Sequence, residues 1–223
     1  MQLLNSSIYG KANDQIYPRT TDILFKIVGC ASLTQEKGIA KGNRDLTIHY
    51  SVMTFSWAMA FANRRGRFDI VRELYRHFAA CPYCGSEPCD CKRGVQKPKR
   101  MLFAEGQPLW SVEAFQRHIA EVYPKNTLAR SGSHLAAESV ELMQAVLDWE
   151  RSQFDAIRSE ELIAAIHEEY SDVIAHLVAI AHCGEFDLAR ETIRIFKDGC
   201  CECHLPECKC PYTNPVRSRS VTK

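Results

Sequence analysis

The sequence has no long unbroken apolar run, no basic-then-apolar start and no excess of one charge. Every apolar stretch is interrupted by a charged residue or a histidine before it reaches membrane-spanning length, so we expect no transmembrane helix. The first fourteen residues carry no secretion signal, which predicts a cytoplasmic protein. A net charge of +1 gives no reason to expect a nucleic acid or another polyanion as partner.

Alternating strand patterns are also scarce, whereas helical periodicity recurs, and this predicts an all-α fold. The 223 residues suffice for one large domain or two small ones with a real core. Ser133 is the expected N-cap of the second helix below. We expect helices over residues 111–123, 134–150, 159–183 and 186–197.

The chain resembles itself at one constant offset. Residues 66–78, GRFDIVRELYRHF, align with residues 184–196, GEFDLARETIRIF. We therefore interpret the chain as a tandem duplication, with repeats over residues 17–95 and 109–212 and a linker within 92–100. Upstream of the aligned segments the apolar helix stripes also correspond: Ile48, Val52, Phe55 and Met59 fall opposite Ile166, Tyr170, Val173 and Leu177.

Eight of the eleven cysteines form two clusters of identical spacing, C-x2-C-x4-C-x-C. Without a secretion signal, such clusters are more typical of metal binding than of disulfides. Four thiolates complete the tetrahedral coordination of Zn²⁺, so we expect two structural zinc knuckles, one ending each repeat. Iron–sulfur clusters, or disulfides in an oxidising compartment, are the alternatives. The expected ligands are Cys81, Cys84, Cys89 and Cys91 in one cluster and Cys200, Cys203, Cys208 and Cys210 in the other.

Two carboxylate pairs share the faces of consecutive expected helices. Glu138 and Glu141 stand three residues apart, and so do Glu169 and Asp172. If the helices are antiparallel the pairs can meet, and they then repel one another unless a cation lies among them. Hard oxygen ligands of this kind suit Mg²⁺ or Mn²⁺. The alternative is that these acids decorate solvated helix faces.

Comparison of the two repeats favours the metal site. Opposite Glu169 and Asp172 the first repeat has Ser51 and Thr54, so the helix persists while its acids are lost. One turn further along, His176 falls opposite Ala58 in the first repeat. This difference is expected if the acids serve chemistry that only one repeat performs.

These residues resemble the signature of the all-α, MazG-like nucleoside triphosphate pyrophosphatases. Segment 134–145, HLAAESVELMQA, is similar to the first acidic helix of that superfamily, and segment 168–177, EEYSDVIAHL, to the second. The resemblance covers about residues 111–198 and, more weakly, the first half. Ser139 and Ser171 stand where the family frequently has glycine, and the cysteine clusters are additions to its minimal fold.

The resemblance implies a helical bundle of two fused repeats that hydrolyses (d)NTP to (d)NMP and pyrophosphate, as in nucleotide-pool house-cleaning. Glu138, Glu141, Glu169 and Asp172 would hold Mg²⁺, which neutralises the phosphates and activates a water. The first repeat would be catalytically degenerate. Related enzymes work as dimers whose helices complete each other's sites, so an internal pseudo-dimer is expected, and further homo-oligomerisation stays open.

Several further residues are candidates for substrate contact. Basic residues in the expected loop before the first acidic helix would contact phosphates, and a tryptophan would stack on the base; solvated charge and core packing are the respective alternatives. The family often has a basic residue on its last helix. The full candidate set is Lys125, Arg130, Trp149, His176, Arg194 and Lys197.

Two rival functions remain open. One is a non-enzymatic, zinc-dependent module that binds nucleic acid or protein, supported by the cysteine clusters and the basic run within 92–100. Against it, the net charge is nearly neutral. The other is a phosphoribosyl-ATP pyrophosphohydrolase, which only a substrate assay distinguishes.

Overall fold

The structure, a computed structural model, describes residues 20–65, 112–152 and 156–199. These residues form helices and no strands, so the all-α class is confirmed for this part of the chain. Both cysteine clusters, the basic run within 92–100 and segment 66–78 lie outside the described residues. The helices are α2 (Thr20–Leu33), the π-helical η1 (Thr34–Ile39), α3 (Arg44–Arg65), α5 (Val112–Val122), α6 (Leu128–Arg151), α7 (Ala156–Cys183) and α8 (Leu188–Phe196).

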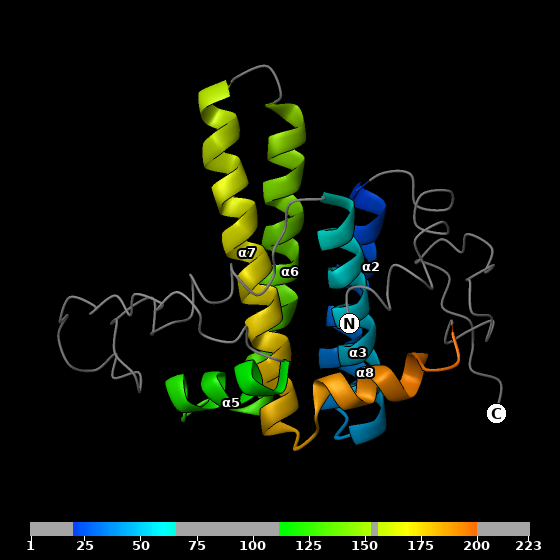
Figure 1. Cartoon of the computed structure of the whole chain (residues 1–223). Coiled ribbons are helices and arrows are strands. Elements are labelled where there is room, and N and C mark those ends of the chain that lie inside the picture. Colours follow the sequence, from blue (N-terminus) through cyan, green and yellow to red (C-terminus); the bar gives the residue numbers. More distant parts are fainter. Residues whose placement is uncertain (1–19, 66–111, 153–155, 200–223) are drawn as a thin grey trace, which may run out of the picture.

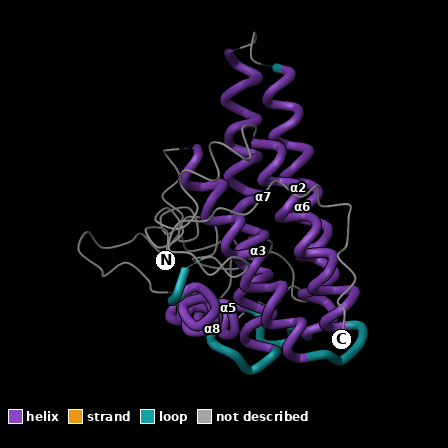
Figure 2. Tube along the Cα trace, turned by 90° about the vertical axis from the view of Figure 1, so that its right-hand side faces the viewer, coloured by secondary structure: helices purple, strands orange, loops and turns teal. Residues whose placement is uncertain are grey.

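The four long helices pack as two hairpins laid side by side. Helix α2 packs on α3 and α6 packs on α7, while α2–α6 and α3–α7 contacts join the two hairpins. In Figures 1 and 2 the α6–α7 hairpin extends beyond the ends of α2 and α3. Helices α5 and α8 lie across the opposite end, where α5 contacts α7 and α8 contacts α3. Within the described ranges, none of the helices combines the length and apolar character that a membrane span needs.

The core is built from the apolar stripes of these helices. Both sequence stripes are buried: each residue of the α3 stripe and each residue of the α7 stripe is at most 6% exposed. Tyr170 joins the two hairpins most directly. Its hydroxyl donates to the Ala58 carbonyl oxygen of α3 at 3.1 Å, and its ring stacks on Phe61 with centroids 5.7 Å apart. Complete burial raises the pKa of Tyr170 well above its usual range.

The segment η1 packs closely on both α3 and α6. A side chain at Gly38 would bring its Cβ to 2.7 Å from the Thr47 Cα, so only glycine fits against that backbone. At Gly132 on α6 an added Cβ would collide with the side chains of Gln35 and Ile39. The Gly132 contact places η1 against the amino-terminal part of α6, from which the acidic residues follow.

The start of α6 differs from the sequence prediction. The helix begins at Leu128, and Thr127 is its N-cap, with Thr127 Oγ1 accepting from the Arg130 N–H at 3.3 Å. Ser133 was wrongly predicted as the cap: it lies inside the helix, where its hydroxyl donates to the Ala129 carbonyl at 3.1 Å. A serine can satisfy its hydroxyl on the preceding turn, so its presence alone does not mark a helix start.

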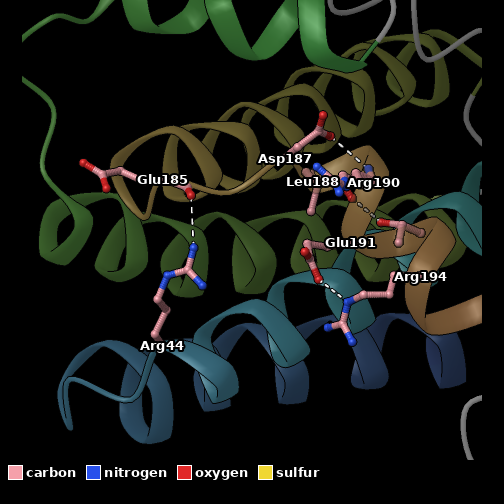
Figure 3. Close-up of polar contacts among 8 residues, drawn as sticks. Arg44, Glu185, Asp187, Leu188, Arg190, Glu191 and Arg194 are labelled. Carbon is pink, nitrogen blue, oxygen red and sulfur yellow. Dashed lines mark hydrogen bonds and ion pairs between the residues drawn. The ribbon is translucent and has the colours of Figure 1, made fainter.

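The junction between α7 and α8 is held by side chains from other helices. Glu185 adopts the left-handed conformation at φ 54°, and its carbonyl accepts from Arg44 Nη2 of α3 at 3.1 Å (Figure 3). Gly184 is needed for space, because a Cβ there would lie 2.9 Å from the Ile180 carbonyl. Asp187 then caps α8 by accepting from the Arg190 N–H at 2.9 Å.

We expect Tyr170→Phe to lower the free energy of unfolding by about 1 kcal/mol, because it removes a buried hydrogen bond while keeping the stacked ring. Tyr50→Phe on α3, a half-buried tyrosine, is the matched control and should change stability by less than about 0.5 kcal/mol. Urea denaturation of the three proteins measures the difference. Equal stabilities would show that the Tyr170–Ala58 bond does not join the hairpins.

Candidate metal and substrate site

The two carboxylate pairs meet where α6 and α7 lie side by side. One oxygen each of Glu138, Glu141 and Glu169 lies within 4.8 Å of the others. Asp172, almost one turn further along α7, is close enough to raise the pKa of Glu138 by its charge. The antiparallel hairpin therefore brings all four acids into one cluster, which we call the carboxylate cluster.

The position of these side chains follows from the helix periodicity. On each helix, every member of the cluster comes immediately before a buried residue. Glu138 and Glu141 precede Ser139 and Leu142, both 0% exposed. On α7 the same rule holds for Glu169 and Asp172, which precede Tyr170 and Val173, and for His176, which precedes Leu177. One position is about 100° around a helix, so these side chains lie at the edge of the packed interface, where Glu141 is exposed and the other four are half-buried.

The cluster carries unfavourable electrostatics. Burial, followed by the charges of Asp172 and Glu141, raises the pKa of Glu138 to about 7. Burial and then Glu138 raise the pKa of Glu169 to about 7, and burial and then Glu169 raise that of Asp172 to about 7. A divalent cation among these oxygens would relieve the repulsion, and carboxylate oxygens are the ligands that Mg²⁺ prefers. The donor set fits such an ion.

Two histidines adjoin the cluster at Glu138. The His176 Nε2 lies 4.0 Å from Glu138 Oε1, and the His134 Nδ1 lies 3.9 Å from the same oxygen. The two rings are stacked, with centroids 5.0 Å apart and planes 13° apart. Burial, then the charges of His134 and Arg130, lowers the pKa of His176 to about 4, so this imidazole is neutral at pH 7. His134 was not among the predicted site residues, although its spacing of four from Glu138 on one helix was a readable signal.

The other candidates are placed as follows. Arg130 lies exposed in the first turn of α6, near enough to influence His176, and Lys125 is exposed in the preceding turn. The prediction that both lie in a loop was wrong for Arg130, because α6 begins at Leu128. Trp149 packs partly buried against the core, eight residues or about 12 Å beyond Glu141 along the helix. This packing matches the core alternative for Trp149.

The two basic candidates of the last helical stretch are engaged locally. The Arg194 Nε pairs with Glu191 Oε2 at 2.7 Å on α8 (Figure 3), and the Lys197 Nζ lies 3.7 Å from Asp198 Oδ2. Helix α8 packs on α3 and α5. The carboxylate cluster is thus assembled from α6 and α7 without α8.

Ser139 and Ser171, which stand where the MazG-like enzymes frequently have glycine, are both buried. Ser139 is 0% and Ser171 is 1% exposed. Their hydroxyls donate to carbonyls one turn earlier on the same helix, Ser139 to Leu135 at 2.7 Å and Ser171 to His167 at 2.8 Å. A small side chain that satisfies its own hydroxyl fits a tight helix contact, so serine is compatible with both positions.

The positions of α3 that align in sequence with Glu169, Asp172 and His176 are closed. Ser51, Thr54 and Ala58 are all 0% exposed on α3, whereas their counterparts on α7 are half-buried. A carboxylate at either of the first two positions would be buried away from water, which is strongly unfavourable without a partner. These positions of α3 therefore hold no second carboxylate cluster.

Comparisons of the chain with protein-family models, with curated proteins and with solved structures found no match. The function must accordingly be inferred from the geometry and chemistry of the cluster itself.

Without added cation, we expect the folded protein to lose stability as pH rises. The raised pKa values mean that the folded state holds these protons more tightly, so the stabilisation is complete below about pH 4 and is lost as pH rises through about 7. Because Glu138 and Glu169 are only partly buried, solvent screening makes this loss smaller than the pKa shifts alone would give. Mg²⁺ should restore stability at pH 8 and have little effect at pH 5.

Thermal denaturation at pH 5 and pH 8, with and without Mg²⁺, measures this effect. Glu138→Gln should reduce both the pH dependence and the response to Mg²⁺. The matched control is Glu150→Gln, an exposed position on the same helix that should leave both unchanged. A Mg²⁺ response that is equal at both pH values would contradict the assignment.

Proposed function

We propose that this chain is a Mg²⁺-dependent nucleoside triphosphate pyrophosphohydrolase that cleaves between the α- and β-phosphates. The observation that carries the proposal is the convergence of Glu138, Glu141, Glu169 and Asp172 from two antiparallel helices. A concentrated, half-buried negative charge is unfavourable for folding by itself. It becomes favourable when cations and a polyphosphate neutralise one another there.

The residues divide into ligands and substrate contacts. Glu138, Glu141, Glu169 and Asp172 would hold the cation, which when bound neutralises the phosphates and makes a water a better nucleophile. Carboxylate oxygens left over from metal binding accept the hydrogen bond that orients the attacking water. The water oxygen would bond to the α-phosphorus while the water's proton passes to a carboxylate of the cluster. The bond from that phosphorus to the bridging oxygen would break, and pyrophosphate would leave with the electron pair.

Basic side chains near the carboxylate cluster would bind the phosphates of the substrate. Arg130 is exposed two turns before Glu138 on α6, and its charge reaches His176. Lys125 lies exposed in the turn before that helix. Both are therefore assigned to the phosphate tail, where charge-assisted hydrogen bonds are strongest. Trp149 is left out of base recognition because it packs against the core.

We further propose that the first repeat is the inactive partner of an internal pseudo-dimer. Helix α2 packs on α6 and α3 packs on α7, so equivalent helices of the two repeats meet in the bundle. The shared hydrogen bond of Tyr170 to Ala58 and its stacking on Phe61 support this arrangement. The helices of the first repeat would then pack against α6 and α7 and support the single site.

We expect the full-length protein to release pyrophosphate from at least one member of a panel of NTPs and dNTPs with Mg²⁺. Glu141→Gln should lower kcat/KM by about a hundredfold or more, the scale expected when one charge-stabilising group is removed. Glu150→Gln, an exposed glutamate on the same helix, is the matched control and should retain full activity. Pyrophosphate release coupled to a phosphate assay measures both.

If no nucleotide in the panel is cleaved by the folded protein, the enzyme proposal fails. Salt-sensitive binding of DNA or RNA by that same protein would then favour the zinc-dependent binding module. Activity confined to phosphoribosyl-ATP would instead keep the superfamily and change the substrate.

A further inference from the structure

A second group of ligand atoms adjoins the carboxylate cluster. His134 and Glu138 from α6 and His176 from α7 each present one atom within 4.8 Å of the other two. Glu138 belongs to both groups, because it also lies within 4.8 Å of Glu141 and Glu169. The group therefore has two nitrogens and one carboxylate oxygen, a donor set different from that of the carboxylate cluster.

The separations in this group are too long for hydrogen bonds. Both imidazole nitrogens are directed at one oxygen, Glu138 Oε1, but stop 3.9 and 4.0 Å from it. Direct N–H···O bonds would be about 2.7–3.2 Å long. A metal ion bonded about 2.1 Å from each atom would instead hold them about 3.0–3.4 Å apart. Small side-chain rotations that move each nitrogen by less than about 1 Å would reach that geometry.

The chemistry of the donors separates them from a magnesium site. Imidazole nitrogen is a poor ligand for Mg²⁺, which demands oxygen, but a good one for the later first-row divalent metals. Two histidines and one carboxylate also leave coordination positions open for water or a phosphate oxygen. The first repeat has none of this set: Thr20 and Ala58 stand opposite Glu138 and His176.

We propose that His134, Glu138 and His176 bind a divalent transition metal of the Mn²⁺ or Zn²⁺ class, beside the Mg²⁺ position and sharing Glu138 with it. The role of this metal rests on the proposed function: it would bind a phosphate oxygen of the substrate next to the hard cation. The inference that a metal binds there depends only on the positions of these side chains on α6 and α7.

Mn²⁺ is the probe that tests the site, because it is paramagnetic and binds thiolates poorly. Because the carboxylate cluster would also accept Mn²⁺, it is first filled with saturating Mg²⁺. Pulsed EPR of the full-length protein with one equivalent of Mn²⁺ should then show coupling to the nitrogen of a coordinated imidazole. His134→Ala and His176→Ala should each weaken Mn²⁺ binding about tenfold or more and reduce the nitrogen coupling. His134 is exposed, so its removal leaves the fold intact even if His176→Ala does not.

His182→Ala is the matched control, since His182 is an exposed histidine on the same helix α7. It should leave the coupling and the affinity unchanged. Bound Mn²⁺ without nitrogen coupling, coupling that survives both histidine substitutions, or no Mn²⁺ binding would each overturn the proposal.

The outcome is separable from that of the proposed function. Mg²⁺-dependent pyrophosphate release without nitrogen-coordinated Mn²⁺ would keep the hydrolase and reject this site. Nitrogen-coordinated Mn²⁺ in a protein that cleaves no nucleotide would keep the metal site and reject the hydrolase.

Discussion

The apolar contact between α6 and α7 is the constraint on which the site depends. Four carboxylates repel one another, and alone they would separate the two helices. Leu135 and Leu142 on α6 and Val173 on α7 are 0% exposed, and burial of each such side chain contributes about 1.5–3 kcal/mol. Because the acids directly precede buried residues, the packing register that fills the core also sets the distances within the cluster. Packing and site chemistry therefore cannot vary independently.

The existence of α3, α5, α6, α7 and α8 and the carboxylate faces were predictable from sequence, because both depend on local periodicity, whereas α2 and η1 were not predicted. The spacing of Glu138 from Glu141 fixes a shared face on any helix, and the buried stripes followed the predicted positions. Details that depend on competing local bonds were not predictable. Ser133 resembles a cap but bonds backward, while Thr127 takes that role. The strained residue after α7 is Glu185 rather than the adjacent glycine, because Gly184 is required for space and Arg44, distant in sequence, holds the Glu185 carbonyl.

The histidines show a different limit of sequence reasoning. His176 could be placed on the acidic face of its own helix, but the atom it approaches belongs to the other helix. Its neighbour His134 lies one turn before Glu138 on α6. The stacking of the His134 and His176 rings depends on the rotation of α6 relative to α7. Residue spacing predicts which side chains share a face of one helix. Predicting which side chains meet across two helices requires knowledge of how the helices pack against each other. Burial lowers the pKa of His176 to about 4, so its imidazole is neutral at pH 7. A free histidine is still partly protonated at that pH.

The difference between α3 and α7 has an energetic reason. Two carboxylate clusters in one bundle would impose their repulsion twice, whereas among the described helices the α6–α7 hairpin alone carries it. On α3 the corresponding positions hold small residues at 0% exposure, so that helix packs closely where α7 stays open. Repulsion among the carboxylates lowers the stability of the folded protein, and close packing of the adjacent helix α3 can offset that loss. In the proposed pseudo-dimer, the packing of α2 and α3 offsets the electrostatic repulsion within the carboxylate cluster.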